Sequence, residues 1–516
     1  MIKLKEKNLI FFRLLYVILA SLIFFKTAWL SDDSFITLNQ VWNFINGDGI
    51  VWNSSQRVQA FTHPLWFLLL SIVSFFTKEL FLTNLIISFI CSITSILILF
   101  NLFFKKNSSV PPESLLIVFS IFCSKAFTDY FTSGLENSLS YLLASIFIYL
   151  TLNSKYQERL KHHLSFIILA CCFLNRFDFA LLFLPITFNY FKNSNYSFSQ
   201  FIKSSWIGAT IVLLWLIFSL FYFGSIFPNT FYAKMNHGYP FLSILKKGML
   251  YSLNLIQRDP VTFITIIFGI TCGLNSKNSS MKSLAIGIFF YWTYILYSGG
   301  GFMQGRFFTL IYFISIFIIL YCLENKSSHL ISLKYFAPLL IICAYLGPRP
   351  ILSNSSYNYG KIRKGIADER GVYYQRYGLL SKNRSWPIVN RIDNKEIRLT
   401  KIKCGGMGAY GLKNKDSFIL IDNCGLTDPF LSRLNVKETN SWRIGHLERV
   451  VPQAYLNYLK NLEFNFHDDR ISSLHSMISS IVSDPLFETK RLINIARLNL
   501  PFIYKYYLKS QGEKTL

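Results

Sequence analysis

The sequence contains few charged residues for its length. Only 15% of its 516 residues are Asp, Glu, Lys or Arg, whereas about a quarter is usual in a soluble domain. Apolar residues make up 52%, and runs such as "LLYVILASLIFF" and "LIISFICSITSILILFNLFF" occur throughout the first two thirds of the chain. Such runs approach the roughly 20 residues that cross a hydrocarbon core. There are too many for one soluble core, so the sequence predicts a polytopic α-helical membrane protein.

Several chemical signatures are also missing. The chain has no Gly-rich dinucleotide motif, no P-loop and no metal-ligand spacing, which argues against a nucleotide-binding fold. The net charge of +25 comes without a nucleic-acid motif, and basic residues near anionic headgroups explain it. Many of the nine cysteines lie in apolar runs, where they act as small hydrophobic residues.

The apolar runs predict about eleven membrane spans. The first is expected to be a retained anchor, because its exit "FKTAWLSDD" has no small-residue cleavage site; a cleaved signal peptide is the alternative. Residues 64–77 are too few to span comfortably, and we expect a helix there in the outer interface. The predicted spans are residues 9–30, 80–104, 114–131, 138–152, 163–175, 178–191, 205–222, 260–275, 282–297, 306–323 and 332–348.

Basic residues in short connections indicate the cytoplasmic side. With the N-terminus inside, these connections are Lys3/Lys5/Lys7, Lys105/Lys106, residues 155–163, Lys192/Lys203, Lys277/Lys282 and residues 324–334. The polar stretches 31–63, 132–138, 174–178, 223–240 and 297–306 then lie outside. Residues 1–348 form the predicted membrane module, and residues 349–516 a soluble α+β domain on the outer side. A disulfide between Cys404 and Cys424 is left open, since an oxidising compartment permits it but spacing cannot show it.

Two adjacent carboxylates, Asp32 and Asp33, follow the first predicted span. Adjacent carboxylates repel each other, so one of them can have a raised pKa. A carboxylate in such a place can accept the proton of a hydroxyl nucleophile as a general base. Solvated, inert carboxylates at a helix exit are the alternative. We expect residues 31–63 to be a catalytic outer loop.

Cations and sugar-binding side chains share the predicted outer face. Arg57, Arg176, Lys234 and Arg306 could bind a lipid phosphate, for which Arg offers a bidentate fork; snorkelling to the interface is the alternative. Aromatic, amide and carboxylate groups that suit a sugar are Trp42, Trp52, His63, Trp66, Glu136, Asp178, Asn229, Tyr232 and Gln304. A generic aromatic belt is the alternative for the rings. Together these residues favour transfer of a glycosyl group from a lipid-linked donor to an extracytoplasmic acceptor.

At these motifs the chain resembles the membrane-embedded GT-C glycosyltransferases. "DDSFITLNQVWNFINGDGIVWNSSQRVQAFTHPLWFLLL", "TSGLENSLSYLL", "NRFD", "FGSIFPNTFYAK" and "GGGFMQGRF" are similar to motifs of the arabinofuranosyltransferase group, which includes mycobacterial terminal β-1,2 enzymes and those acting on type IV pilin. The resemblance continues through "GIADERGVYY", "IDNCGLTDPFLSRL" and "WRIGHLERVVPQAYL", and so covers nearly the whole chain.

The resemblance implies a polyprenyl-phosphoryl pentose donor, inversion at the anomeric carbon and a base at Asp33 or Asp32. It implies Arg306 or Lys234, with Arg176 behind them, as the groups that compensate the leaving phosphate. A divalent metal beside the two carboxylates occurs in some members. The composition, rich in Lys, Asn, Phe and Ile, points to an AT-rich genome, so we expect a Gram-negative inner membrane and a periplasmic glycan, lipid or pilin acceptor.

One motif departs from the family pattern. Gly299, Gly300 and Gly301 stand where a "GGD" motif is expected, which puts the substrate or metal requirement in doubt. Asp428 and His446 are present in "GLTDP" and "RIGH", where acceptor recognition competes with a purely structural role. A hexose donor is the nearest alternative function. A flippase is less favoured because no internal repeat is found, and a non-catalytic assembly protein would tolerate loss of Asp32 and Asp33.

Overall fold

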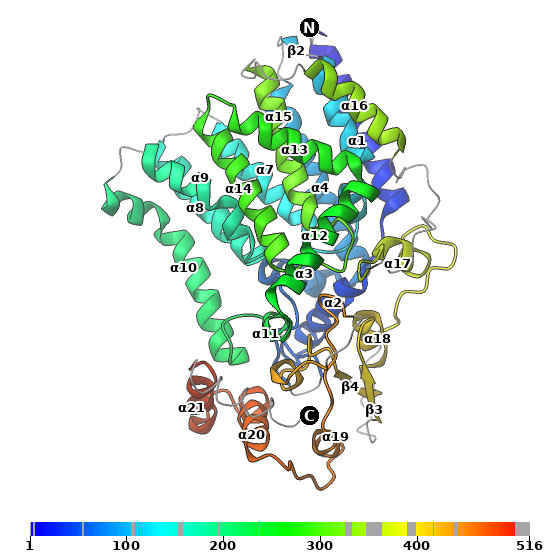
Figure 1. The fold of residues 1–516 in the computed structure, drawn as a ribbon, viewed down its shortest axis with the longest axis vertical. Coiled ribbons are helices and arrows are strands. Elements are labelled where there is room, and N and C mark those ends of the chain that lie inside the picture. Colours follow the sequence, from blue (N-terminus) through cyan, green and yellow to red (C-terminus); the bar gives the residue numbers. More distant parts are fainter. Residues whose placement is uncertain are drawn as a thin grey trace. The chain divides into compact units, whose positions relative to one another are not determined.

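The structure is a computed structural model, and it is mostly helical (Figure 1). The described residues are 2–3, 6–53, 56–104, 109–110, 112–152, 158–193, 197–236, 238–325, 333–346, 364–389, 399–415, 417–437 and 442–500. Lys5, Lys105, Lys106 and Lys155, which we expect in cytoplasmic connections, lie outside these residues.

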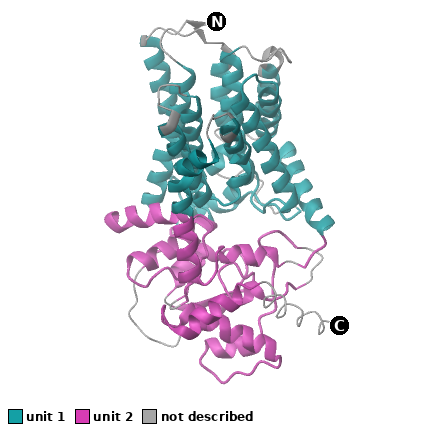
Figure 2. Cartoon of the chain, turned by 90° about the vertical axis from the view of Figure 1, so that its left-hand side faces the viewer, with its two compact units in different colours: residues 1–31, 81–212, 241–385 teal, residues 32–80, 213–240, 386–516 magenta. Residues whose placement is uncertain are grey.

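The chain divides into two compact units, coloured separately in Figure 2. Unit 1 comprises residues 1–31, 81–212 and 241–385, and unit 2 comprises residues 32–80, 213–240 and 386–516. Unit 2 therefore draws on three separate parts of the sequence, whereas the predicted division placed a single boundary at 348/349. One helix, α10 (Phe198–Phe223), contributes residues to both units.

Unit 1 is a helical bundle. Its helices are α1 (Glu6–Thr27), α4 (Phe81–Phe103), α5 (Pro112–Ser120), η1 (Ile121–Cys123), α6 (Lys125–Tyr130), α7 (Asn137–Leu152), α8 (Glu158–Asn175), α9 (Phe179–Asn193), α12 (Phe241–Arg258), α13 (Pro260–Leu274), α14 (Ser279–Tyr297), η2 (Arg306–Phe308), α15 (Thr309–Glu324), α16 (Leu333–Leu346) and α17 (Glu369–Tyr377). A short antiparallel pair joins β1 (Ile2–Lys3) to β2 (Ser109–Val110). Helix α15 is the centre of this bundle, because it packs against α13, α14, α7 and α4 and most of its residues are buried.

Four described helices are long and apolar enough to cross a membrane: residues 7–27, 81–103, 198–223 and 306–324. The pair α12–α13, bent by 109°, makes a fifth if it is one span. Five further apolar helices are shorter: Pro64–Thr77, Ser114–Cys123, Asn137–Leu152, Leu160–Asn175 and Phe179–Tyr190. The prediction of a helical protein with several membrane-length helices is confirmed; the larger number of spans and their orientation stay predictions.

Unit 2 combines short helices with one small sheet. Its helices are α2 (Asp32–Ile45), α3 (Pro64–Thr77), α11 (Asn229–Met235), α18 (Met407–Asn414), η3 (Leu431–Arg433), α19 (Gln453–Leu459), α20 (Asp469–Ser483) and α21 (Thr489–Leu498). Strands β3 (Leu399–Lys403) and β4 (Phe418–Asp422) pair in parallel, with Leu399 opposite Phe418. Strand β4 lies within the alternating apolar run at residues 417–426, and helix α21 lies within residues 484–500.

The first half of the expected loop 31–63 is a helix. Phe35, Leu38 and Val41 recur at helical spacing and are buried, and two carboxylates in the first turn suit the positive end of the helix dipole. The next helix, α3, begins with Pro64 at its first position. Its C-terminal cap residue is Lys78, whose φ of 56° is the left-handed backbone conformation that commonly terminates a helix. The expected helix at 64–77 is confirmed.

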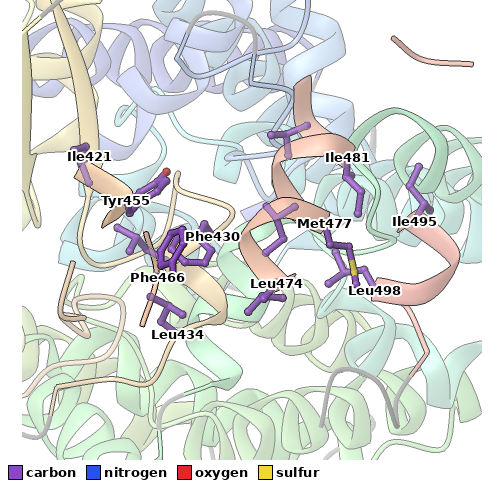
Figure 3. Close-up of a cluster of buried hydrophobic side chains, with 13 residues drawn as sticks. Ile421, Phe430, Leu434, Tyr455, Phe466, Leu474, Met477, Ile481, Ile495 and Leu498 are labelled. Carbon is purple, nitrogen blue, oxygen red and sulfur yellow. The ribbon is translucent and has the colours of Figure 1, made fainter. Parts of the chain in front are cut away.

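The larger core of unit 2 lies among α19, α20 and α21 (Figure 3). Its labelled members include Phe430 and Phe466 from the connections, Tyr455 from α19, and Leu474 and Ile481 from α20. Helix α20 begins at the cap residue Asp468, whose carboxylate accepts the backbone N–H of Arg470 at 2.8 Å. A cap of this kind stabilises a short helix by about 1 kcal/mol, and the buried face of the helix supplies most of the remaining stability.

Candidate functional site

The two adjacent carboxylates at the start of α2 have different surroundings. Asp32 is 6% exposed, and its carboxylate accepts the backbone N–H groups of Gly408 at 3.0 Å and of Ala409 at 3.1 Å. Asp33 is only half-buried. Burial raises the pKa of Asp32 to about 6, and the two backbone N–H groups oppose that shift. Asp32 thus attaches α2 to the N-terminal turn of α18, where a carboxylate is favoured by the helix dipole.

Gly408 permits this contact by lacking a side chain. A Cβ atom at this position would lie 1.9 Å from the backbone oxygen of Asp32, much closer than any real contact. The sequence that makes the approach possible is "CGGMG" at residues 404–408. It was not predicted to take part in a site, although its many small residues could have indicated a close backbone contact.

The polar face of α2 holds the segment that follows it. Gln40 donates to the carbonyl of Val58 at 2.6 Å and accepts the N–H of Ala60 at 3.0 Å. His63 Nε2 lies 2.7 Å from Thr37 Oγ1, one helical turn beyond Asp33. These contacts hold residues 58–63 against α2 and place Asp33 and His63 in the same unit.

The tryptophans expected to bind a sugar are largely covered by protein. Trp66 is 0% exposed and Trp52 is 3% exposed; Trp52 packs with Ile36 and Met407 in a small core cluster. Trp42 is half-buried, with the ammonium group of Lys415 at 5.6 Å from its ring centroid. Of the three rings, Trp42 is the most accessible.

Arg57 makes its described contacts with the end of α20. Its guanidinium donates to the carbonyl oxygens of Ile481 and Asp484. Carbonyls at a helix C-terminus are unsatisfied within the helix and carry partial negative charge. This position gives Arg57 a structural role whatever else it binds.

A network of four charged groups lies in unit 1. Glu136 is 0% exposed and accepts hydrogen bonds from Arg176 Nη1 at 3.1 Å and from Arg306 Nη2 at 2.9 and 3.0 Å. Arg176 also holds Asp178 in a bidentate pair at 2.9 and 2.6 Å, and Tyr291 donates to that carboxylate at 2.9 Å. Four residues predicted from three separate motifs therefore meet, with two positive and two negative charges.

A second buried ionic cluster in unit 1 was not predicted. Lys125 contacts Asp129 and lies 3.2 Å from Asp368, and Arg370 Nη1 is 3.6 Å from Asp129. All four are at most 3% exposed. Asp368 also accepts the N–H of Gly371 and so begins α17. The charged residues within the sequences "KAFTDY" and "IADER" could have indicated this cluster.

The remaining predicted residues of unit 2 are bonded within it. Asn229 donates to the carbonyls of Gly425 at 2.8 Å and Leu426 at 3.1 Å. Asp428 accepts the N–H groups of Phe430 and Leu431 and the hydroxyl of Tyr455, and burial raises the pKa of Asp428 to about 7.

His446 is neutral at physiological pH. Burial, with the nearby charges of Arg443 and Lys234, lowers the pKa of His446 to about 3. An uncharged imidazole can both donate and accept hydrogen bonds, which suits a sugar hydroxyl as well as a protein partner. In unit 1, Gln304 donates to Asn254 at 2.9 Å.

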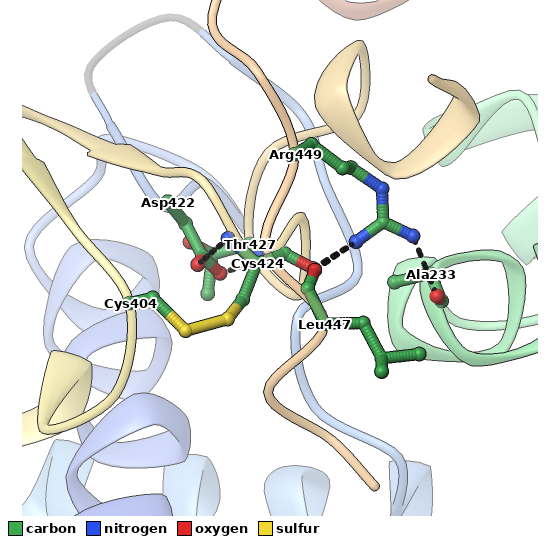
Figure 4. The surroundings of a disulfide bond; sticks show 7 residues. All are labelled: Ala233, Cys404, Asp422, Cys424, Thr427, Leu447 and Arg449. Atoms are coloured by element: carbon green, nitrogen blue, oxygen red, sulfur yellow. Dashed lines mark hydrogen bonds between the residues drawn. A yellow bond between two sulfur atoms is a disulfide. The ribbon is translucent and has the colours of Figure 1, made fainter. Parts of the chain in front are cut away.

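The structure pairs Cys404 with Cys424 in a disulfide (Figure 4). Asp422 accepts the N–H groups of Cys424 and Thr427, both at 2.9 Å, and Arg449 donates to the carbonyl oxygens of Cys424, Leu447 and Ala233. Because Cys404 lies four residues before Gly408, the disulfide fixes the segment that leads to the Asp32 contact. The question that spacing left open is answered in favour of a bond.

Within the described residues, no group of three or more His, Cys, Asp or Glu side chains could hold a metal ion. Asp32 and Asp33 are the only residues that the resemblance offers for one.

Comparison with known proteins gives one partial similarity to report. Over 123 residues the chain is 33% identical to a terminal β-(1→2)-arabinofuranosyltransferase of Corynebacterium glutamicum. The aligned part is 23% of this chain and 18% of that relative. No family model matches the chain, and no solved structure matches it.

Proposed function

We propose that this protein is a membrane-embedded inverting glycosyltransferase. In this proposal it moves a pentose, arabinofuranose in the first instance, from a polyprenyl-phosphate-linked donor to an acceptor on the outer side of a bacterial inner membrane. The acceptor would be a glycan, a lipid or a pilin-type protein.

The observation that carries this proposal is the partial similarity to an arabinofuranosyltransferase. The membrane-length helices support it, because a polyprenyl-linked donor stays in the bilayer. A glycosyltransferase of this kind needs no nucleotide-binding fold, in keeping with the absence of the corresponding motifs from the sequence.

The geometry favours Asp33 over Asp32 as the general base. Asp32 is 6% exposed and its oxygens already accept two backbone N–H groups from α18, so a substrate hydroxyl has little access to that carboxylate. Asp33 is more exposed and lies on the helix next to a carboxylate that is fixed in place. In this assignment Asp32 positions α2, and Asp33 takes the proton.

The proposed step is a single displacement. The acceptor hydroxyl oxygen forms a bond to the anomeric carbon while the bond from that carbon to the phosphate oxygen breaks, with inversion. Asp33 receives the hydroxyl proton, and polyprenyl phosphate leaves with the bonding electron pair. Cations that bind the phosphate stabilise the negative charge that develops on it.

Arg306 and Arg176 are the proposed phosphate ligands in unit 1, with Lys234 and Arg57 as further candidates in unit 2. One nitrogen of Arg306, Nη2, donates to both oxygens of Glu136, and a guanidinium group also binds phosphate oxygens. A phosphate would therefore compete with Glu136 for that guanidinium group. Asp178, Gln304, Asn229, Asp428 and His446 remain candidates for sugar or acceptor contact.

The test is transfer of labelled arabinose from polyprenyl-phosphoryl arabinose in membranes that contain the wild type, Asp33→Asn or Asp32→Asn. We expect the Asp33→Asn variant to lose at least about a hundredfold in rate, which is the usual contribution of a general base. Asp48→Asn changes an exposed carboxylate on the same segment and is the matched control.

Each outcome decides between the alternatives. Equal transfer by Asp33→Asn and wild type would remove the proposed base. Loss of transfer with Asp32→Asn alone would exchange the two roles. If the wild type transfers a hexose but no arabinose, the donor assignment is wrong; if it transfers neither sugar, the enzymatic proposal fails and a transport or assembly role takes its place.

A further inference from the structure

Helix α12 has two different sides. Ile244, Gly248, Tyr251 and Leu255 recur at helical spacing and are buried. The opposite side exposes large apolar residues: Leu242 is 75%, Met249 50%, Leu253 49% and Ile256 40% exposed. An exposed stripe of this length on one helix indicates that an apolar medium or partner covers it.

The charges of α12 identify that medium. The helix contains Lys246, Lys247 and Arg258 and no acidic residue. Lys246 lies on the exposed side, between Leu242 and Met249, and Lys247 is half-buried beside it. Basic residues along an apolar stripe are typical of helices that lie in the surface of an anionic bilayer.

The direction of α12 fits the same position. Helix α13 begins directly after it, with Asp259 as the cap residue and Pro260 at the first helical position, and the two axes meet at 109°. If α13 crosses the membrane, α12 is nearly parallel to the membrane plane. Its 18 residues then extend about 27 Å along the surface.

The buried side of α12 supports the turn at residues 298–306. The backbone of Leu296 lies so close to Gly248 that a Cβ atom there would come within 2.3 Å of the Leu296 carbonyl oxygen. Tyr251 donates its hydroxyl to the carbonyl of Met303 at 2.8 Å and accepts the N–H of Phe307 at 3.3 Å. Arg306 lies between Met303 and Phe307 in the chain and donates a hydrogen bond to Glu136.

We propose that α12 lies flat in the headgroup layer of the membrane, where Lys246 and Lys247 bind anionic phospholipid. In this position α12 stabilises the turn that contains Arg306. The proposal does not depend on sugar transfer. It requires only that unit 1 is embedded in a bilayer.

The first experiment measures depth in nanodiscs. A fluorescent amino acid at position 242, 249 or 253 is quenched with lipids brominated at shallow or deep acyl positions, and Ile90 on α4, 55% exposed, is the membrane-span control. We expect shallow lipids to quench all three α12 positions strongly and equally. A steady gradient of depth from 242 to 253 would show a tilted or re-entrant segment, and absence of quenching while position 90 is quenched would show that α12 is outside the bilayer. Either result overturns the proposal.

The second experiment tests the lipid charge. The wild type and the double variant Lys246→Gln/Lys247→Gln are purified and incubated with mixed phosphatidylcholine–phosphatidylglycerol nanodiscs, and bound phosphatidylglycerol is counted by mass spectrometry. Two lysines near a charged surface should enrich phosphatidylglycerol about tenfold, and the double variant should lose most of that enrichment. Lys277→Gln/Lys282→Gln removes two exposed lysines near the opposite end of α14 and is the matched control.

The effect on the turn is measured by amide hydrogen exchange of residues 298–306, which include Arg306. Phosphatidylglycerol should slow amide hydrogen exchange of residues 298–306 in the wild type and in the Lys277/Lys282 control, but not in the Lys246/Lys247 variant. Equal enrichment in both double variants, or exchange of this turn that does not respond to phosphatidylglycerol in the wild type, would refute the corresponding half of the proposal.

Discussion

The two units handle buried positive charge differently. In unit 1, Arg176, Arg306 and Lys125 are paired with carboxylates. In unit 2, Arg449 and Arg491 donate to backbone carbonyls instead. The contacts of Arg491, which is 0% exposed, are the carbonyl oxygens of Ile481, Leu486, Phe221 and Tyr222.

The difference follows from what each unit is built of. Most of unit 1 is built of longer helices, whose interior carbonyls are already bonded. A buried cation among them needs a carboxylate partner, because an isolated charge in an apolar bundle is costly. Unit 2 consists of short helices and irregular connections, which leave many carbonyls unsatisfied. The five N–H donors of arginine can join several of these at once.

The largest effect should come from breaking charge balance in unit 1. Glu136→Gln leaves Arg176 and Arg306 facing one carboxylate, Asp178, and should destabilise the protein by about 3–5 kcal/mol. The double variant Glu136→Gln/Arg306→Gln restores the balance and should recover part of that loss. Thermal unfolding in detergent, followed by Trp fluorescence, measures both; a single variant as stable as the wild type would contradict the ion-pair account.

A smaller loss is expected from Arg449→Met in unit 2. The described hydrogen bonds of Arg449 go to the carbonyls of Leu434, Cys424, Leu447 and Ala233, and leaving buried acceptors unsatisfied should cost about 3 kcal/mol in total. Arg470→Met removes an exposed arginine as the control. Proteolysis that cuts unit 2 of both variants at the same rate would argue against the carbonyl contacts.

Removing the disulfide should cost about 2–3 kcal/mol, as expected for a closed loop of this length. The Cys404→Ser/Cys424→Ser variant should also exchange the amide of Gly408 faster, since that residue follows the bond by four positions. Reduced wild type is the parallel sample. Unchanged protection of the Gly408 amide in both samples would show that the disulfide does not support the Asp32 contact.

The smallest effect, taken per pH unit, is a dependence of stability on pH to which two buried carboxyl groups of unit 2 contribute. Burial raises the pKa of Asp32 to about 6 and of Asp428 to about 7, from a usual 3.8. The folded protein therefore retains these protons at a pH where the unfolded chain has released them, so the free energy of unfolding falls as pH rises from 3.8 toward 7. The slope should be on the order of 1 kcal/mol per pH unit.

Asp428→Asn should flatten that slope near pH 6 to 7, and Asp48→Asn should leave it unchanged. A melting temperature that rises over this range in the wild type, or a slope that Asp428→Asn does not alter, would count against the buried carboxyl groups as its source.

Local sequence patterns predicted the helices of the membrane part well. Apolar runs located α4 and α13 within a few residues, and Pro64 marked the start of α3. The helix at Asp32–Ile45 was missed because its polar residues resemble a loop. Its polar residues Thr37 and Gln40 are buried because they bond to His63, Val58 and Ala60, and the sequence does not show these contacts.

Contacts between residues far apart in the sequence could not be predicted. The choice between Asp32 and Asp33 depends on Gly408, 376 residues away in the sequence. Likewise Trp52 was assigned to sugar binding from its type, yet it packs with Met407. The sequence placed Glu136, Arg176 and Arg306 on one predicted face, but it predicted neither that they meet nor the hydrogen bonds among them.

The three-part origin of unit 2 constrains how the chain can be made. Asp32 bonds to Gly408 and Ala409, and Gly408 is synthesised 376 residues after Asp32. Unit 2 therefore cannot finish folding during synthesis of the membrane helices, and α2 must wait for its partner. Residues 349–516 expressed alone would lack two of the three segments, so a soluble fragment cut there should not reproduce this unit.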